Sequence, residues 1–261
     1  MVRRIALPLS FVLVAFAAAA EDWAQFRGPT GNSLLFISSG YNLPSFSAGG
    51  ADGADDVTKT QVARTLVLVA FAQAPAQSPQ GLFDRAIADF LSGRISESVA
   101  EFDTVARLAP GLAPQLWQRG IALYYAGRYK DCRAQFESHR TVNPDDVENA
   151  VWHFLCVARA ESPAKARAAL LPVGPDSRVP MRQIYQMFRG SMKPEDVLAA
   201  TPSEPTSEFY AHLYLGLYFD ALANKDRALE HIAVAAADRY ALAGGYMHSV
   251  ARIHLGMLER K

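Results

Sequence analysis

The stretch GRISESVAEFDTVARLAP, residues 93–110, and the stretch GRYKDCRAQFESHRTVNP, residues 127–144, decide the fold of this chain. The second stretch begins and ends 34 residues after the first, and the side chains keep the same register, since Phe102 corresponds to Phe136. A period of this length is typical of a helix, a tight turn, a second helix and a connection, stacked into a solenoid. The sequence therefore predicts an all-α protein built from helical hairpins.

Each repeated position has a physical role in such a hairpin. The turn glycines, Gly93 and Gly127, lie where a residue without a Cβ atom is favoured. Gly120 lies where the first helix presses on the second, and a larger side chain would hold the backbones apart. Phenylalanines fill the space between helices, at about 1.5 to 3 kcal/mol for each buried side chain, and prolines end the second helix. The full set of landmarks is Gly93, Phe102, Pro110, Gly120, Gly127, Phe136, Pro144 and Gly216.

Beyond residue 146 the pattern is less regular. Prolines and a glycine interrupt the chain between residues 172 and 180, so we expect a divergent helical pair after them. The regular spacing returns around Gly216, and the last apolar stretch predicts a helix that caps the open end of the stack. The helices that we expect in this part span residues 145–159, 164–171, 181–188, 194–200 and 246–258.

The period and its landmarks resemble the tetratricopeptide repeat (TPR) family. Over about residues 81–260 the chain is similar to an exported or organellar family of single-domain TPR proteins that has no assigned activity. The resemblance implies a TPR-type superhelix that serves as a binding scaffold, and it implies no reaction. The strings that carry it are LWQRG at 116–120, RTVNPDD at 140–146, WHFLC at 152–156 and YAHLYLGLY at 210–218.

The N-terminal region differs from the rest of the chain. Arg3 and Arg4 precede an apolar stretch, residues 5–20, that ends in three alanines. This is typical of a secretory signal peptide, and the stretch is shorter than the ~20 residues of a membrane-spanning helix. We therefore expect a signal peptide at residues 1–20 and an exported product, periplasmic or secreted, which stays tethered to the membrane if the signal is uncleaved.

Residues 21–78 have the composition of a linker, which predicts disorder over most of them. Residues 21–29 resemble the start of quinoprotein-like β-propellers, but no later blade pattern follows. A second signal-like apolar segment occupies residues 59–74. Either the natural product begins near this segment, or its core is a short apolar helix that lies against the domain. The repeat domain is expected to span residues 79–261.

Charge and motifs exclude several classes of function. The charges of the 26 basic and 26 acidic residues cancel, so no overall electrostatic field favours nucleic acid, and we expect no nucleic-acid partner. We also expect no stable membrane span after signal removal. The chain contains no G-x-S-x-G, H-E-x-x-H, phosphate-loop or dinucleotide-binding motif. We therefore expect no catalytic residue and no cofactor.

The two cysteines and two nearby histidines invite a zinc interpretation. Cys132 and His139 lie seven residues apart on one predicted helix, and therefore about 10 Å apart along its axis, too far for one ion with bonds of about 2.0 to 2.3 Å. We therefore expect no metal site here. A disulfide between Cys132 and Cys156 is more plausible than zinc in an exported protein. Because Cys132 occupies the position of a small buried residue, we expect free thiols.

The first helix of each repeat lines the concave surface of a TPR superhelix, so a partner protein or peptide would bind there. Aromatic residues and arginines dominate binding hot spots. For any one of these residues, packing between helices is the more frequent role, but the set predicts an aromatic-lined groove. Its residues are Trp117, Ile121, Tyr124, Tyr125, Val151, Leu155, Arg159, Leu213 and Leu217.

Two polar residues, Arg119 and His153, are further candidates for this groove. The alternative hypothesis is a hydrolase-like enzyme or an accessory subunit of one, in which His153, Arg119 and Glu148 converge in a pocket. Self-association into a homodimer is a third alternative.

Overall fold

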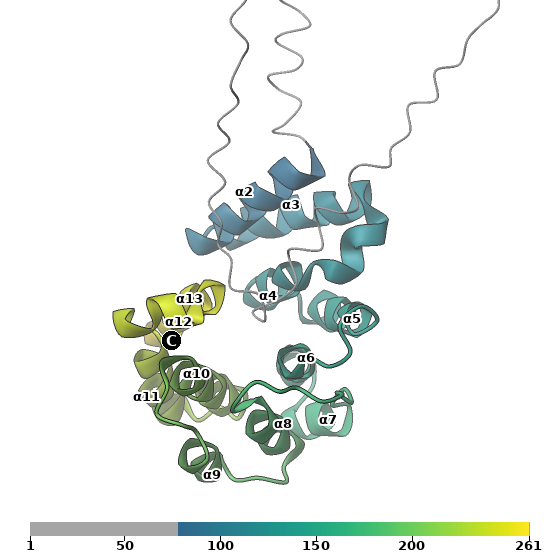
Figure 1. The fold of residues 1–261 in the computed structure, drawn as a ribbon. Helices are drawn as coiled ribbons and strands as arrows, with labels where there is room; N and C mark the ends of the chain where they lie inside the picture. The colour runs from purple at the N-terminus through teal and green to yellow at the C-terminus, as the bar shows by residue number, and fades with distance from the viewer. Residues whose placement is uncertain (1–77, 261) are drawn as a thin grey trace, which may run out of the picture. The chain divides into compact units, whose positions relative to one another are not determined.

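The computed structural model describes residues 78–260, coloured from blue to yellow in Figure 1. All of them belong to one compact unit of the chain. Every regular element in this range is a helix, and the range contains no strand. The prediction of an all-α fold is confirmed. The predicted signal peptide, the linker and the second apolar segment lie outside the described residues.

Consecutive helices pair as hairpins, and most pack mainly on their neighbours in sequence. The elements are α2 (Pro79–Leu91), α3 (Ile95–Leu108), η3 (Pro110–Gln115), α4 (Trp117–Tyr125), α5 (Tyr129–His139), α6 (Val147–Ala160), α7 (Pro163–Ala168), α8 (Met181–Arg189), α9 (Pro194–Ala199), α10 (Pro205–Ala221), α11 (Lys225–Ala235), η4 (Asp238–Tyr240), α12 (Ala241–Gly244) and α13 (Tyr246–Glu259). The exceptions are α8, which packs chiefly on α6, and α13, which packs chiefly on α11. The expected divergent middle pair is α8 with α9. Pro110 follows α3 as expected, but it also opens the 3-10 helix η3.

Two glycines let the helices of a hairpin approach closely, as the repeat pattern predicts. A Cβ atom on Gly120 of α4 would lie 2.6 Å from Cζ of Phe136 on α5. A Cβ atom on Gly216 of α10 would likewise collide with the side chain of Ile232 on α11. No side chain fits at these two positions without moving its neighbour, so the glycines set the distance between the paired helices.

The turns inside three hairpins share one backbone conformation. Gly93 and Gly127 have φ values of 76° and 73°, in the left-handed region that favours glycine. The corresponding residue between α10 and α11 is Ala223, with a φ of 59°. Its N–H donates to the carbonyl of Asp220, as that of Gly127 donates to the carbonyl of Tyr124. The last hairpin therefore adopts the same turn without the glycine.

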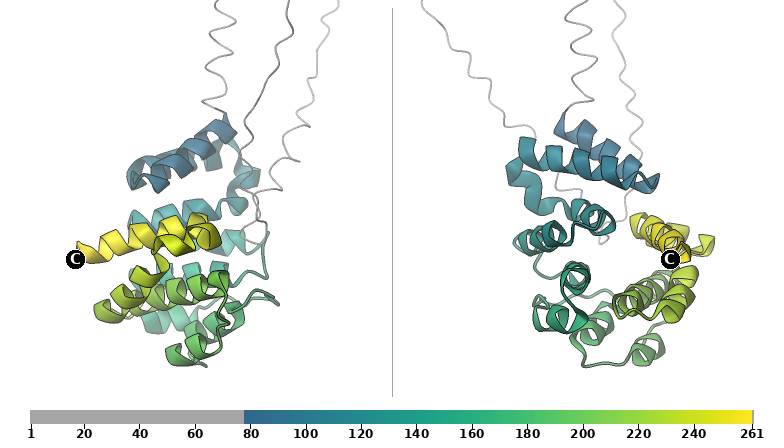
Figure 2. Two further views of the ribbon diagram at one scale, coloured as in Figure 1. Left: turned by 60° about the vertical axis from the view of Figure 1, so that its left-hand side comes forward. Right: turned by 180° about the vertical axis from the view of Figure 1, so that it is seen from behind.

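The last helix, α13, packs on α11 and also lies beside α2, as Figures 1 and 2 show. Tyr246 at its start stacks on Phe90 of α2, with ring centroids 5.6 Å apart and planes 17° apart. Gly244, just before α13, approaches Phe209 so closely that a Cβ atom would lie 2.6 Å from its ring. The expected capping helix is present, and it brings the end of the helical run back to its beginning.

Candidate functional site

Most of the predicted groove residues are buried between helices. Ile121, Val151, Leu155 and Leu213 have no exposed surface, and Leu217 has almost none. These apolar side chains hold α4, α6 and α10 in place, which is the usual role of such residues at helical spacing. Tyr124 is also buried, whereas Trp117, Tyr125 and Arg159 are partly exposed.

An aromatic cluster forms where α2, α4 and α13 meet. Tyr246 contacts Phe90 and also Trp117, whose ring lies edge-on at a centroid distance of 5.2 Å. Tyr125 contacts Phe90 at 5.8 Å. Two residues distant in sequence thus extend the aromatic surface that α4 was predicted to carry. We call Phe90, Trp117, Tyr125 and Tyr246 the aromatic cluster.

Two polar atoms of the aromatic cluster are buried without a hydrogen-bond partner among the described residues. They are Nε1 of Trp117 and the hydroxyl oxygen of Tyr246. Burial raises the pKa of Tyr246 well above its ordinary value of 10. The phenol therefore stays protonated, and its O–H can donate a hydrogen bond. Buried polar atoms in folded proteins nearly always have a partner, and an exception requires an explanation. Both atoms are donors, but both are buried, so an acceptor from another molecule reaches them only if neighbouring side chains move.

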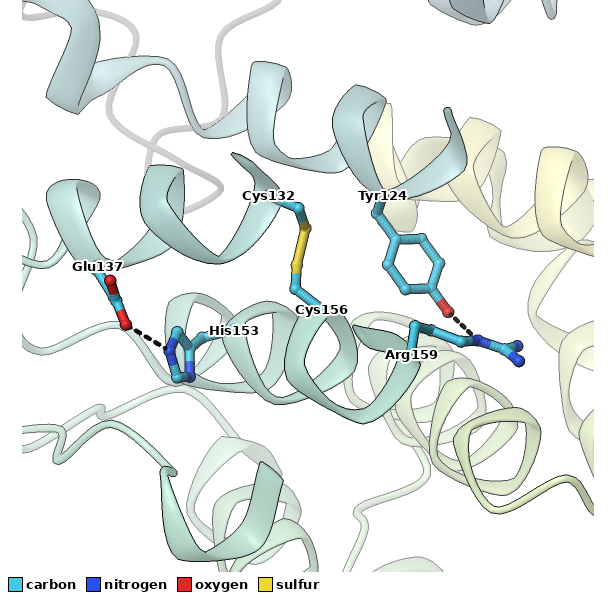
Figure 3. Close-up of a disulfide and its surroundings, with 6 residues drawn as sticks. All are labelled: Tyr124, Cys132, Glu137, His153, Cys156 and Arg159. Carbon is cyan, nitrogen blue, oxygen red and sulfur yellow. Dashed lines mark hydrogen bonds and ion pairs between the residues drawn. A yellow bond between two sulfur atoms is a disulfide. The ribbon is translucent and has the colours of Figure 1, made fainter. Parts of the chain in front are cut away.

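A polar network continues from this cluster across the inner side of the hairpins. Arg159 of α6 donates from Nε to the hydroxyl of Tyr124 at 3.2 Å, as Figure 3 shows, and from Nη2 to the carboxylate of Asp220. Nε2 of His254 lies 3.3 Å from the same carboxylate. Nδ1 of His254 lies 3.2 Å from the hydroxyl of Tyr125. The inner network, Tyr124, Tyr125, Arg159, Asp220 and His254, therefore joins α4, α6, α10 and α13.

The carboxylate of Asp220 is paired with both Arg159 and His254. Burial alone would raise the pKa of Asp220, but His254 and then Arg159 outweigh it and hold this pKa well below its usual range. Burial raises the pKa of Tyr124 to about 12 and that of Tyr125 well above 10. Both phenols stay protonated at neutral pH. They serve as hydrogen-bonding groups rather than as nucleophiles.

The polar candidates Arg119 and His153 lie elsewhere. Arg119 donates to Asp103 and Gln135, each at 2.7 Å, between α3, α4 and α5. His153 contacts Glu137 of α5 at 3.3 Å (Figure 3), and burial lowers the pKa of its imidazole. Within residues 78–260, Arg119 and His153 share no hydrogen-bond or ion-pair partner.

Glu148, the third residue of the alternative hypothesis, belongs to a separate ionic cluster. Arg178 donates to Glu148, Asp146 and Asp176, each at 2.6 Å, and the hydroxyl of Tyr214 on α10 also donates to Glu148. Burial is the main cause that raises the pKa of Glu148 to about 7, although Arg178 opposes it. This cluster shares no partner with Arg119 or His153 among the residues that the structure covers.

The two cysteines pair, contrary to the prediction from the sequence. We expected free thiols, but Cys132 of α5 and Cys156 of α6 form a disulfide, with Cα atoms 5.9 Å apart (Figure 3). Both side chains are fully buried. The position of Cys132 does require a small buried residue, but the neighbouring helix places a second small residue opposite it. This distance is the usual one for a disulfide.

Three residues of the site were not predicted from the sequence, namely Asp220, Tyr246 and His254. Asp220 had a signal, because it is a charged residue at the end of the strongly apolar helix α10. Tyr246 and His254 lie eight residues apart, on one face of α13, but only the return of α13 to α2 and α4 gives them a role.

Comparisons with known proteins add no family. No protein-family model matches the chain, and a search of curated proteins finds no similar one. None of the helices between residues 78 and 260 combines the length and the apolar composition needed to cross a membrane.

Proposed function

We propose that this chain is an exported TPR-type scaffold that binds an extended segment of another protein and catalyses no reaction. The binding site would lie along α4 and α13, from the aromatic cluster to the inner network. The repeat period of 34 residues in the sequence supports the TPR type.

The observation that carries this proposal is the pair of unused donors, Nε1 of Trp117 and the hydroxyl of Tyr246. An extended peptide presents a main-chain carbonyl about every 3.3 Å, and carbonyl oxygens are the acceptors that these donors lack. The rings around them supply the aromatic surface that dominates binding energy in protein interfaces. Arg159, whose side chain is 25% exposed, lies at the other end, where it is paired with Asp220.

The disulfide supports the exported location. Disulfides persist in oxidising compartments and are rare in the cytosol. Cys132 and Cys156 join two successive hairpins, and the predicted signal peptide would deliver the chain to such a compartment.

The test starts from peptides selected on the full chain from a random-peptide library, with affinity measured by fluorescence anisotropy. Trp117→Ala should weaken binding by about 30-fold or more, because it removes a central aromatic anchor. Tyr246→Phe deletes one hydroxyl and should weaken binding by about 2- to 10-fold. Tyr185→Phe is the matched control, since its hydroxyl donates to the carbonyl of Leu171 on the separate α8 side.

Tyr246→Phe keeps the ring, so it tests the proposal even if Trp117→Ala perturbs the fold. Selected peptides that bind the wild type and both site variants equally would contradict the proposal. A selection that enriches no peptide would contradict it as well.

A further inference from the structure

Two histidines face each other on the hairpin of α10 and α11, away from the inner network. Nδ1 of His212 on α10 lies 3.1 Å from Nδ1 of His231 on α11, and the ring centroids are 5.2 Å apart. His231 is 3% exposed, and His212 is partly exposed to solvent. The two ring nitrogens therefore lie within hydrogen-bond distance of each other, and His212 is the more exposed of the two residues.

The packing of the hairpin fixes these rings. Helices α10 and α11 approach most closely where Gly216 meets Ile232. Gly216 lies one turn after His212, and Ile232 is the residue next to His231. The ring of His231 stacks on Phe219 at 5.6 Å with planes 12° apart. The guanidinium of Arg227 lies 3.9 Å above the ring of Phe219. Stacking therefore holds the ring of His231, and the close approach of the two helices sets the distance between the residues, which is the preorganisation that a ligand site needs.

Both imidazoles favour the neutral form that binds metals. Burial lowers the pKa of His212, and the neighbouring His231 lowers it further. Arg239 also lowers this pKa, whereas Glu208 and Glu230 raise it. Burial also lowers the pKa of His231, near Glu230, Arg227 and Glu195. A neutral imidazole has a lone pair on one ring nitrogen, and in the hydrogen-bonded pair one Nδ1 donates its hydrogen to the lone pair of the other.

We propose that His212 and His231 bind one late first-row divalent ion, Zn²⁺ or Cu²⁺, through their Nδ1 atoms. Two nitrogens at about 2.0 to 2.1 Å from a tetrahedral ion lie roughly 3.3 to 3.4 Å apart, so a shift of a few tenths of an ångström seats the ion. Within the described range no group of three or more His, Cys, Asp or Glu side chains is placed to hold a metal. Water completes the coordination, and the ion exchanges readily. By the usual order of stability Cu²⁺ binds more tightly than Zn²⁺.

The competing explanation is a hydrogen bond in which one Nδ1–H donates to the other Nδ1. A metal replaces that proton, and each ring then carries its hydrogen on Nε2. The two explanations differ in a measurable way. Only a metal site predicts metal binding that requires both rings.

The test is a titration of the full, metal-free chain with CuSO₄ and ZnSO₄, followed by electron paramagnetic resonance for Cu²⁺ and calorimetry for Zn²⁺. We expect one ion for each chain and a Cu²⁺ spectrum with two nitrogen ligands. His212→Ala and His231→Gln should each lower the metal affinity by more than about tenfold. Removing a partner that only contacts a ligand already costs about tenfold, so removing a ligand itself should cost more. His139→Gln is the matched control, because it alters a buried histidine on α5 whose Nδ1 hydrogen-bonds the carbonyl of Pro114.

His212 is partly exposed, so its variant tests the site even if His231→Gln lowers stability. Zn²⁺ should also raise the melting temperature of the wild type and of His139→Gln, but not that of His212→Ala. Equal Cu²⁺ affinity in the wild type and His212→Ala, or a spectrum without nitrogen ligands, would overturn the proposal.

Discussion

Helix α6 holds the hairpin of α4 and α5 on one side and helix α10 on the other, but it uses different chemistry for each. On the first side, Cys156 is bonded to Cys132 of α5, and His153 also contacts Glu137 there. On the second side, Arg159 and Glu148 of α6 contact Asp220 and Tyr214 of α10. One contact is covalent, and the others depend on charge and protonation.

The difference shows how one chain divides its stability between two kinds of condition. A disulfide constrains the unfolded chain whatever the pH, provided that the surroundings are oxidising. Ionisable contacts between buried groups change with pH, because each shifted pKa links protonation to folding. Only the side of α5 should therefore respond to reductant, whereas pH acts on both sides, through His153 and Glu137 on the side of α5 and through Glu148 on the side of α10.

The largest effect should follow loss of the disulfide. Its cysteines are 24 residues apart, and closing a loop of this size stabilises a protein by about 3.5 kcal/mol in the chain-entropy model. The double variant Cys132→Ala/Cys156→Ala should lose about that much free energy of unfolding in a urea titration. Wild type unfolded in the presence of dithiothreitol should lose a similar amount. A loss that grows or shrinks between pH 5 and pH 8 would break the comparison.

The second effect should come from Glu148 and depend on pH. Its pKa is about 7 in the folded chain and near 4.5 when unfolded, so between these values the folded state binds more protons. Its contribution is therefore fully present below pH 4.5 and is lost as the pH rises through 7, a change on the order of 3 kcal/mol.

Glu148→Gln should remove this dependence. Buried histidines such as His139 and His153, whose pKa values are lowered, act in the opposite sense. The quantity to measure is thus the difference in free energy of unfolding between Glu148→Gln and wild type from pH 5 to pH 8. As the pH rises, the variant should become more stable relative to the wild type. A difference that does not change with pH would contradict the raised pKa of Glu148.

The smallest effect should come from the turns of the two hairpins. Ala223 occupies the left-handed conformation that Gly127 occupies in the earlier hairpin. Such a conformation costs an alanine about 1 to 2 kcal/mol, partly offset by the lower entropy of its unfolded chain. Ala223→Gly should therefore stabilise the protein by about 0.5 to 1 kcal/mol in thermal unfolding, and Gly127→Ala should destabilise it by a similar amount. Changes of the same sign in both variants would show that the turns are not equivalent.

The parts of the fold that sequence predicted are local. The period that relates Phe102 to Phe136, and the close approach at Gly120, are set by contacts between a helix and its neighbour. Ala223 was not recognised as a turn residue, because the packing of α10 on α11 imposes its conformation. The return of α13 to α2 joins residues far apart in sequence, and no local pattern encodes it.

The site was predicted in part for the same reason. Trp117, Tyr124, Tyr125 and Arg159 belong to the aromatic cluster or the inner network, and each lies on a helix whose inner face follows from the repeat. Their partners on α10 and α13 could not be paired with them from spacing alone.

The return of α13 to α2 also bears on how the protein unfolds. A linear array of hairpins frays from its ends, because the terminal units have a neighbour on one side only. Here the contact between Tyr246 and Phe90, and the link from Tyr125 to His254 across 129 positions, give both ends of the array a second neighbour. Amide hydrogens of the first and last helices should therefore exchange with solvent in one cooperative opening rather than one helix at a time.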